Sequence, residues 1–371
     1  MSIVNLQSDP IYVRSPYNIT FQIANILGSK IELFIWNNGD TPPTSPTYTL
    51  EKLIPSTTNT TMIYNVSNYV REYIDFVSNS PNNVATPIAE PSGEWAYIKV
   101  IRYQLEITGY VELDTKTWYA FDGFGYYQDG YNPDLGEIGL EPGTYEYWYD
   151  ADNPATGNPQ AFLNRATMIR VVPELNYEVV YTSLENGAQS NFTFNPAVIG
   201  PVQKFWSVFP SYEEYGNTIE YKNALGTVLA TWTFKPISEC KYTPVVCDFV
   251  NKYGSWQRTI FFKASMTSIE TKRDQYNLYL DSIINYDTSE RQKRGFNINA
   301  KETIKVNTDW VDESYNELIL KPLMMSEIVL LDNEPVNILT KKTELFEHIN
   351  KKMINYQLEF EYAFDIINNV V

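Results

Sequence analysis

The chain has 371 residues, of which 43% are hydrophobic and 15% aromatic, and its formal net charge is −17. This hydrophobic content excludes a disordered chain, and the length suffices for two or three domains, each with its own core. A charge of −17 opposes non-specific binding to nucleic acid, which needs basic surface to neutralise phosphates. The same charge suits a wall past which DNA slides, although ordinary solubility explains it more simply.

The N-terminal part is predicted to form strands and one short helix. Residues 10–24 give a first β segment that Pro16 interrupts, and strands are expected at 30–36 and 48–54. Apolar side chains between 66 and 78 recur at helical spacing, so we expect a short helix there, lying on the strands.

A loop and a hairpin are expected next. Residues 78–92 are rich in Pro, Asn and Ser and predict a linker or a long loop, whereas 94–107 and 109–121 have the pattern of a β-hairpin. The first domain is therefore extended to about residue 130. Residues 122–160 are rich in Gly, Asp, Tyr and Pro, which favours a long ordered insertion or a surface loop over a continuous core strand.

β-Patterning returns further along the chain. It covers 168–187 and 218–236, and Asn223–Gly226 predicts a turn between two strand runs. Residues 242–265 predict a strand, a turn and a second strand. Residues 266–301 are polar and charged, and we expect a linker there.

The C-terminal part mixes helix and strand signals. Thr308 or Asp309 precedes an apolar-periodic run that ends near residue 321, which is a helix-start signal, and Pro322 is expected to limit or kink that helix. A strand is expected at 326–331, and another at 354–365 closes the chain.

The closing strand alternates between an apolar and a polar face. Its polar face is suited to line a channel for DNA, to pair edge-to-edge with a neighbouring copy, or to be the outer face of an ordinary sandwich. The candidate interaction residues on this face are Asn355, Gln357, Glu359 and Glu361.

Together these signals predict a mostly-β protein with two or three β-sandwich-like domains of the immunoglobulin or fibronectin kind and a small α+β C-terminal part. The expected domains are an N-terminal β-sandwich at 1–130, a β domain with a long aromatic and acidic loop at 131–235, and a hub-like α+β domain at 236–371.

No signature of an enzyme accompanies this pattern. His348 is the only histidine and lies in an expected exposed helix, no serine lies in a GxSxG motif, and no phosphate-binding loop is present. The spacing of Cys240 and Cys247 makes zinc improbable. We therefore expect no catalytic residue, no metal and no cofactor. The first 15 residues have no apolar core and no 18-residue apolar run occurs, so neither a signal peptide nor a membrane span is expected.

The aromatic and acidic loop leaves three interpretations open. Asp122, Asp129 and Asp134 lie among aromatic residues, so the loop is a sugar site, a calcium site or a contact loop, and long loops usually serve contacts. Glu213 and Glu214 form a further acidic pair, of a kind that glycosidases also use.

Residues 252–262 raise a separate question, because a tight turn flanked by aromatic residues joins two strands there. Gly254 supplies the backbone freedom that such a turn needs, and nothing nearby is nucleophilic. We expect a β-hairpin whose Tyr253, Gly254 and Trp256 serve assembly.

A family resemblance rests on several segments. The run CDFVNKYGSWQRTIFF, the segment NTDWVDESYNELILKPLMMSEIVLL and the closing INYQLEFEYAFDIINN resemble virion proteins of tailed phages that infect Bacteroidetes, including crAss-like phages. The N-terminal PIYVRSPYNITFQI, KIELFIW, YTLEKLIPS and VSNYVREYIDF are similar to the N-terminal β-sandwich of these proteins. The resemblance covers most of the chain and is weakest across 122–215.

The resemblance implies a structural subunit of the phage tail, either a hub or baseplate component or a tail-adaptor ring. Its partners would be further copies of itself in a ring and other tail proteins, and it would be assembled in the cytoplasm of the bacterial host. The alternative is a receptor- or glycan-binding module at the tail tip, with Tyr126, Tyr127, Tyr131 and Trp148 stacking on sugar. A cell-wall hydrolase that uses the acidic loop is a third interpretation.

Overall fold

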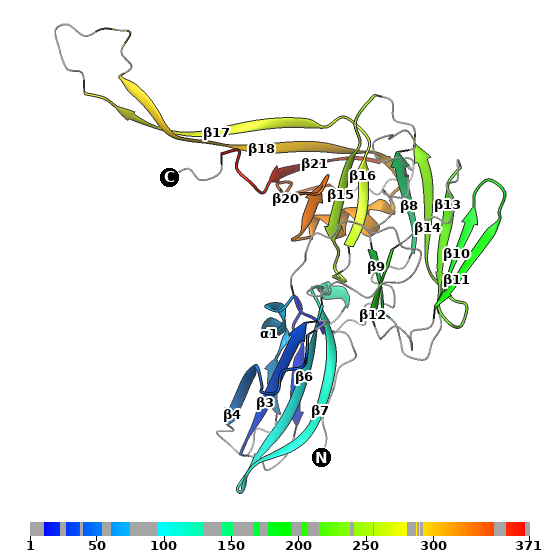
Figure 1. Cartoon of the computed structure of the whole chain (residues 1–371), viewed down its shortest axis with the longest axis vertical. Coiled ribbons are helices and arrows are strands. Elements are labelled where there is room, and N and C mark those ends of the chain that lie inside the picture. Colours follow the sequence, from blue (N-terminus) through cyan, green and yellow to red (C-terminus); the bar gives the residue numbers. More distant parts are fainter. Residues whose placement is uncertain are drawn as a thin grey trace. The chain divides into compact units, whose positions relative to one another are not determined.

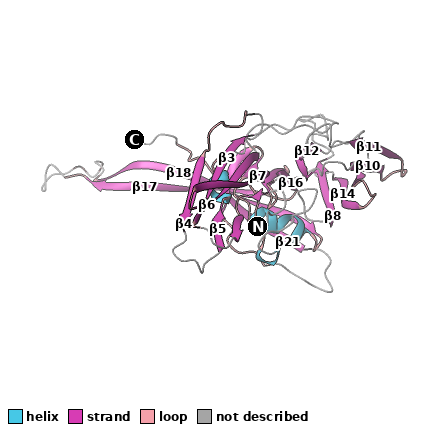
Figure 2. Ribbon diagram, turned by 90° about the horizontal axis from the view of Figure 1, so that it is seen from below, coloured by secondary structure: helices cyan, strands magenta, loops and turns pink. Residues whose placement is uncertain are grey.

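The computed structural model of the chain describes residues 11–22, 27–37, 40–53, 61–74, 95–129, 143–150, 166–170, 177–194, 202–206, 215–237, 241–254, 256–279, 287, 289, 292–344 and 354–367. Strands make up 60% of the structure and helical segments 8%, which confirms the predicted mostly-β class (Figure 2). A small helical part lies near the C-terminus, as predicted.

The chain divides into two compact units. The first comprises Met1–Tyr149, Pro154–Pro236 and Val250–Gln257, and the second comprises Asp150–Asn153, Ile237–Phe249 and Arg258–Val371. The finer division into three domains, with boundaries at 130 and 235, stays a prediction.

A five-stranded sheet lies in the N-terminal part of the first unit, in the order β1, β7, β6, β3, β4 (Figure 1). The strands are β1 (Ile11–Tyr12), β3 (Gly28–Asn37), β4 (Tyr48–Leu53), β6 (Trp95–Glu106) and β7 (Gly109–Phe121). β1 runs parallel to β7, and the other neighbours are antiparallel. The strands predicted at 30–36 and 48–54 and the predicted hairpin that follows residue 93 are therefore confirmed.

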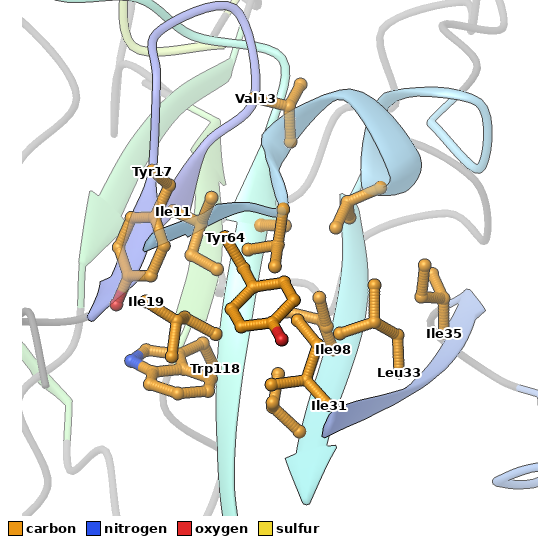
Figure 3. Close-up of a cluster of buried hydrophobic side chains, with 14 of the residues drawn as sticks. Ile11, Val13, Tyr17, Ile19, Ile31, Leu33, Ile35, Tyr64, Ile98 and Trp118 are labelled. Carbon is orange, nitrogen blue, oxygen red and sulfur yellow. The ribbon is translucent and has the colours of Figure 1, made fainter. Parts of the chain in front are cut away.

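A second layer covers one face of this sheet. It consists of the antiparallel pair β2 (Asn18–Gln22) and β5 (Thr61–Asn65), followed by helix α1 (Ser67–Arg71). Ile31, Leu33 and Ile35 alternate along β3 toward the core, where the ring of Tyr17 meets Trp118 edge-on at 5.8 Å (Figure 3). Each fully buried side chain of this kind contributes about 1.5–3 kcal/mol. The helix expected near 66–78 is present but shorter, and residues 75–78 lie outside the described residues.

One charged side chain points into this core. Arg102 is buried on β6, directly opposite Asp114 on β7, and donates from Nε and Nη2 to the two carboxylate oxygens at 2.6 and 2.5 Å. Its guanidinium also lies 5.3 Å from the centroid of the Phe21 ring. The two parallel hydrogen bonds and the ring contact compensate for taking the charge out of water.

A further sheet has five strands in the order β11, β10, β13, β14, β8, so that β8 lies at one edge. Its strands are β8 (Gly143–Asp150), β10 (Tyr177–Ser183), β11 (Gln189–Phe194), β13 (Asn217–Lys222) and β14 (Val228–Ile237), while β9 (Ala166–Arg170) pairs separately with β12 (Val202–Trp206). β8 is a strand within 122–160, the segment expected to be a long ordered insertion or a surface loop. Tyr145 on β8 is buried against Trp232, so packing with distant residues makes a strand of a segment rich in turn formers.

The turn predicted at Asn223–Gly226 is confirmed between β13 and β14. The Asn223 side-chain oxygen accepts hydrogen bonds from the backbone N–H groups of Leu225 and Thr227, and Gly226 has a φ of 78°. Asparagine thus fixes the turn through its own carboxamide, and glycine supplies the left-handed backbone.

The second unit is built on a seven-stranded sheet in the order β16, β15, β19, β20, β21, β18, β17. Its strands are β15 (Val245–Val250), β16 (Trp256–Phe261), β17 (Met266–Asn277), β18 (Lys293–Val311), β19 (Val329–Leu331), β20 (Glu334–Ile338) and β21 (Ile354–Tyr362). Cys247, Phe249, Phe261 and Phe360 lie in its core. β19 lies within the strand expected at 326–331.

β17 and the first half of β18 correct the predicted linker at 266–301. The two strands pair from Met266 opposite Lys305 to Asn277 opposite Lys293. β17 is exposed along its whole length, so neither of its faces needs to be apolar. The prediction missed it because the alternation that marks a half-buried strand is absent when both faces meet water.

The helix expected from residue 308 begins later than predicted. β18 continues to Val311, and the helical part consists of a π-helical turn, η2 (Asn316–Leu320), and helix α4 (Lys321–Met324). Thr308 and Asp309 lie at an irregularity in the pairing of β18 with β21, where Thr308 Oγ1 accepts from the Tyr356 N–H. The polar residues therefore serve a bulge and not a helix cap. Pro322 lies in the first turn of α4, where its missing N–H is tolerated.

A tight turn joins β19 to β20 through Asp332 and Asn333, which both have positive φ, at 49° and 71°. This is the backbone of a two-residue hairpin turn, and Asn and Asp are favoured in it. The Asp332 carboxylate accepts the Val246 N–H at 2.9 Å. Burial raises the pKa of Asp332, and the nearby charges of Asp248 and Glu334 raise it further.

Asp332→Asn is expected to stabilise the second unit at pH 7. A carboxyl whose pKa is raised by folding binds its proton more tightly in the folded state. Its contribution to the free energy of unfolding is therefore fully present below the ordinary pKa of 3.8 and is lost as pH rises through the folded-state pKa. Asparagine stays neutral, keeps the acceptor and suits the turn. Urea unfolding from pH 3 to pH 7 checks this: the advantage of the variant should grow with pH, and parallel curves would contradict it.

Candidate functional site

The turn between β15 and β16 belongs to the first unit, and its side chains are buried there. Gly254 has a φ of 75° and donates its N–H to the Asn251 carbonyl at 3.0 Å. A Cβ atom at this position would lie 3.2 Å from the Asp122 nitrogen. Two features therefore favour glycine at position 254: the left-handed backbone and the close approach of the Phe121–Asp122 segment.

Aromatic rings surround this turn. Tyr253 packs with Tyr12, Trp95 and Phe121 in one buried cluster, and its ring meets that of Tyr12 edge-on at 6.5 Å. Trp256 is also buried. The three residues predicted to serve assembly, Tyr253, Gly254 and Trp256, are thus covered by their own chain and present no free surface.

Lys252 extends the same arrangement into the aromatic loop. It is only 3% exposed, its Nζ lies 3.3 Å from Asp129 Oδ2 and 4.5 Å from the centroid of the Tyr126 ring, and its carbonyl accepts the Phe124 N–H at 2.7 Å. A buried ammonium needs such compensation. The turn therefore holds the start of the loop in place, and Asp129 is engaged by Lys252.

The predicted sugar-stacking residues are not brought together as one platform among the described side chains. One ring contact of Tyr126 is the buried Lys252 and another is Phe124, edge-on at 5.6 Å, whereas Tyr127 is 96% exposed. Trp148 lies on β8, but its side chain is outside the described part, and Tyr131 lies outside the described residues altogether. Asp134, Glu213, Glu214, Cys240 and His348 also lie outside them. Across the described ranges, no three His, Cys, Asp or Glu side chains gather in a way that could hold a metal ion.

The closing strand β21 has the predicted alternation. Ile354, Tyr356, Leu358 and Phe360 are buried, and Asn355 and Gln357 are exposed. The alternative that it pairs edge-to-edge with a neighbouring copy stays a prediction: β18 occupies one of its edges, and on the other edge β20 pairs with Phe360–Tyr362.

Glu359 and Glu361, the remaining candidates on the polar face of β21, are engaged within the sheet. Lys301 Nζ lies 2.8 Å from Glu361, and Lys305 Nζ lies 3.6 Å from Glu359. Both pairs join β21 to β18 across the outer face. Exposed pairs of this kind contribute about 0–1 kcal/mol each, so they align the strands more than they stabilise them.

β17 and β16 are the two edge strands of the sheet, and β17 with the first half of β18 forms a two-stranded ribbon. We define the ribbon as Met266–Asn277 and Lys293–Glu302. β21 pairs with β18 only from Thr303 onward, so within the described strands the ribbon has no third strand beside it. Both views show it extending beyond β21 (Figures 1 and 2). The C-terminal segment lies against the inner end of the ribbon: the Ile366 N–H donates to the Ala300 carbonyl, and the Asn299 carboxamide donates to Asp365 and to the Ile367 carbonyl and accepts the Ile367 N–H.

The ribbon exposes large apolar side chains on a chain segment that has no core of its own. The rings of Tyr276 and Phe296 meet edge-on at 5.5 Å across its two strands. The exposed apolar residues of the ribbon are Met266, Ile269, Tyr276, Phe296 and Ile298. Two-stranded ribbons are marginally stable alone, and exposed apolar surface next to an open strand edge marks an interaction site.

Sequence reasoning missed the ribbon as a site, although one signal was available. Thr, Ile and Tyr, which favour strands, recur between charged residues in 266–277, and a polar hairpin of this composition is compatible with an extended arm. The structure contains no helix, within the described residues, of the length and hydrophobicity that a membrane crossing requires. In comparisons with known proteins, no protein-family profile matches the chain and no curated protein matches it significantly.

Proposed function

We propose that this protein is a structural subunit of a bacteriophage tail, a hub, baseplate or tail-adaptor component that works through protein–protein assembly into a ring. The tail assignment comes from the sequence resemblance to virion proteins of phages that infect Bacteroidetes. Within this proposal the N-terminal layers correspond to an immunoglobulin- or fibronectin-like sandwich.

The observation that supports assembly best is the β17–β18 ribbon. Its strands are held by backbone pairing and a few exposed side-chain contacts, and its apolar side chains face water on a single chain. A partner that covers the ribbon would remove this apolar surface from water, at about 25 cal/mol for each Å² buried. Such a contact, repeated around a closed set of copies, produces a ring.

Light scattering over a concentration series, with negative-stain images of any large species, tests the proposal. The parent chain is expected to pass from the 42.9 kDa monomer toward one closed ring as concentration rises. A matched variant replaces Glu270–Lys301 with Asn-Gly, which joins the directly paired Ile269 and Glu302 by a two-residue turn. This variant should fold and stay monomeric. A parent chain that remains monomeric throughout would contradict the proposal.

A further inference from the structure

The outer strand ends of the ribbon are basic in an acidic protein, whereas residues 278–292, which join them, carry a net charge of −2. We define the ribbon tip as Lys272–Asn277 and Lys293–Asn297. It holds four basic side chains, those of Lys272, Arg273, Lys293 and Arg294, against the single acid Asp274. Its net charge is +3, which leaves −20 on the remainder of the chain. Within the part of the chain that the structure describes, no ion pair engages these four side chains, so an acidic partner is electrostatically complementary to them.

An acidic corner lies at the other end of the same strand. It comprises Trp310, Asp312, Glu313 and Glu317, where β18 ends and the helical part begins. Trp310 is 58% exposed, and the three acidic residues are exposed. Glu317 forms an exposed pair with Lys321 at 3.0 Å, and Asp312 accepts the Ser314 N–H. An exposed tryptophan is typical of an interface, and acidic residues beside it suit the polar rim of a contact with a basic partner.

The tip and the corner of one chain cannot meet. Both belong to the end regions of β18, and the 17 residues from Arg294 to Val311 span roughly 55 Å of extended strand. Their complementary charges and aromatic groups can therefore pair only between copies. A contact between two different patches is heterologous, and repeated heterologous contacts close into a ring or continue as a filament.

From these observations we infer that the ribbon tip of one copy docks on the acidic corner of the next, in a head-to-tail contact. This inference rests on the proposed function and specifies its interface. The guanidinium and ammonium groups of the tip pair with Glu313 and Glu317, and Trp310 packs with the exposed aromatic pair Tyr276 and Phe296. Nucleic acid is the less favourable occupant of the tip, because the chain as a whole carries −17.

A charge swap tests the contact. Lys272→Glu with Arg294→Glu in one variant, or Glu313→Lys with Glu317→Lys in another, is expected to weaken self-association at least about tenfold. Combining all four substitutions in one chain should restore it. Lys341→Glu with Lys342→Glu is the matched control, with the same reversal at exposed sites of the same unit, and should leave association unchanged. Equal weakening by the control, or no rescue in the combined variant, would overturn the inference.

A cysteine pair separates this inference from the proposed ring. Arg294→Cys and Glu313→Cys are made in two separate chains, each with Cys240→Ser. Cys247 is left in place because it is buried and burial raises the pKa of its thiol well above the ordinary range, so the thiol stays unreactive. Mixing the two reduced chains with an added oxidant, such as oxidised glutathione, should give a disulfide-linked pair faster than either chain alone under the same conditions. Crosslinking without a ring would support the docking and contradict the ring, whereas a ring without crosslinking would overturn the docking alone. Tip variants that keep self-association but lose binding to a DNA duplex would also overturn it.

Discussion

Replacing Arg258 with leucine is expected to destabilise the second unit by about 3–5 kcal/mol. Arg258 donates from Nε and Nη2 to the two carboxylate oxygens of Asp248 at 2.7 and 2.9 Å, and Asp248 is only 1% exposed. Removing the guanidinium leaves a buried carboxylate without its counter-charge. Urea unfolding followed by circular dichroism measures the loss in the free energy of unfolding.

Two further variants show whether the loss comes from the unpaired charge. The double variant Asp248→Val with Arg258→Leu removes both charges, and it should recover to within about 1 kcal/mol of the parent, since apolar replacements of a buried pair are often neutral. Lys301→Leu breaks the exposed pair with Glu361 and should cost less than about 1 kcal/mol. A double variant as unstable as Arg258→Leu would show that the packing of the guanidinium, and not its charge, is what the unit needs.

Tyr253→Ala is expected to destabilise the first unit by about 3–4 kcal/mol, although the residue lies in a hairpin turn. Its ring is 4% exposed and fills the space between Tyr12, Trp95 and Phe121, so truncation leaves a cavity that the rigid strands β1, β6 and β7 cannot close. Tryptophan fluorescence during urea unfolding reports this loss, because Trp95 belongs to the same cluster.

Tyr127→Ala is the matched control, as the same side chain at a site that is 96% exposed, and should change the free energy of unfolding by less than about 0.5 kcal/mol. Tyr253→Phe keeps the ring and removes only the hydroxyl, so it should lie much closer to the parent than to Tyr253→Ala. Equal effects of Tyr253→Ala and Tyr127→Ala would mean that the turn contributes nothing to the core.

Strands with one buried face could be predicted from the sequence, and β3 and β21 are the clearest examples. Their alternating side chains record which face is buried, and that pattern is local. β8 and β17 could not be predicted in the same way. β8 is a short alternating run inside a segment rich in Gly, Asp and Pro, and it pairs with a distant strand, β14; both faces of β17 meet water, so no periodic signal marks β17. Thr308 was misleading because a bulge and a helix cap use the same polar residue types.

The candidate site shows the same division. The turn at Gly254 could be predicted from its glycine, but its burial could not, because the contact with Tyr12 and Phe121 joins segments more than 100 residues apart. The polar face of β21 was predicted correctly, but the place of β21 between β18 and β20 could not be predicted, since alternation gives the orientation of side chains and not the order of strands.

Under the proposed assembly, the basic ribbon tip would also disfavour certain wrong complexes. Open strand edges of identical chains tend to join symmetrically, and such a dimer would bury both ribbons and stop growth. Here a symmetric pairing of two tips would bring together two patches of net charge +3, and like charges placed face to face cost several kcal/mol. The charges of the same lysines and arginines also disfavour edge-to-edge stacking of β17 strands into fibrils. Under the proposed head-to-tail contact, this repulsion would keep new subunits out of dead-end pairs and leave them available for directional addition.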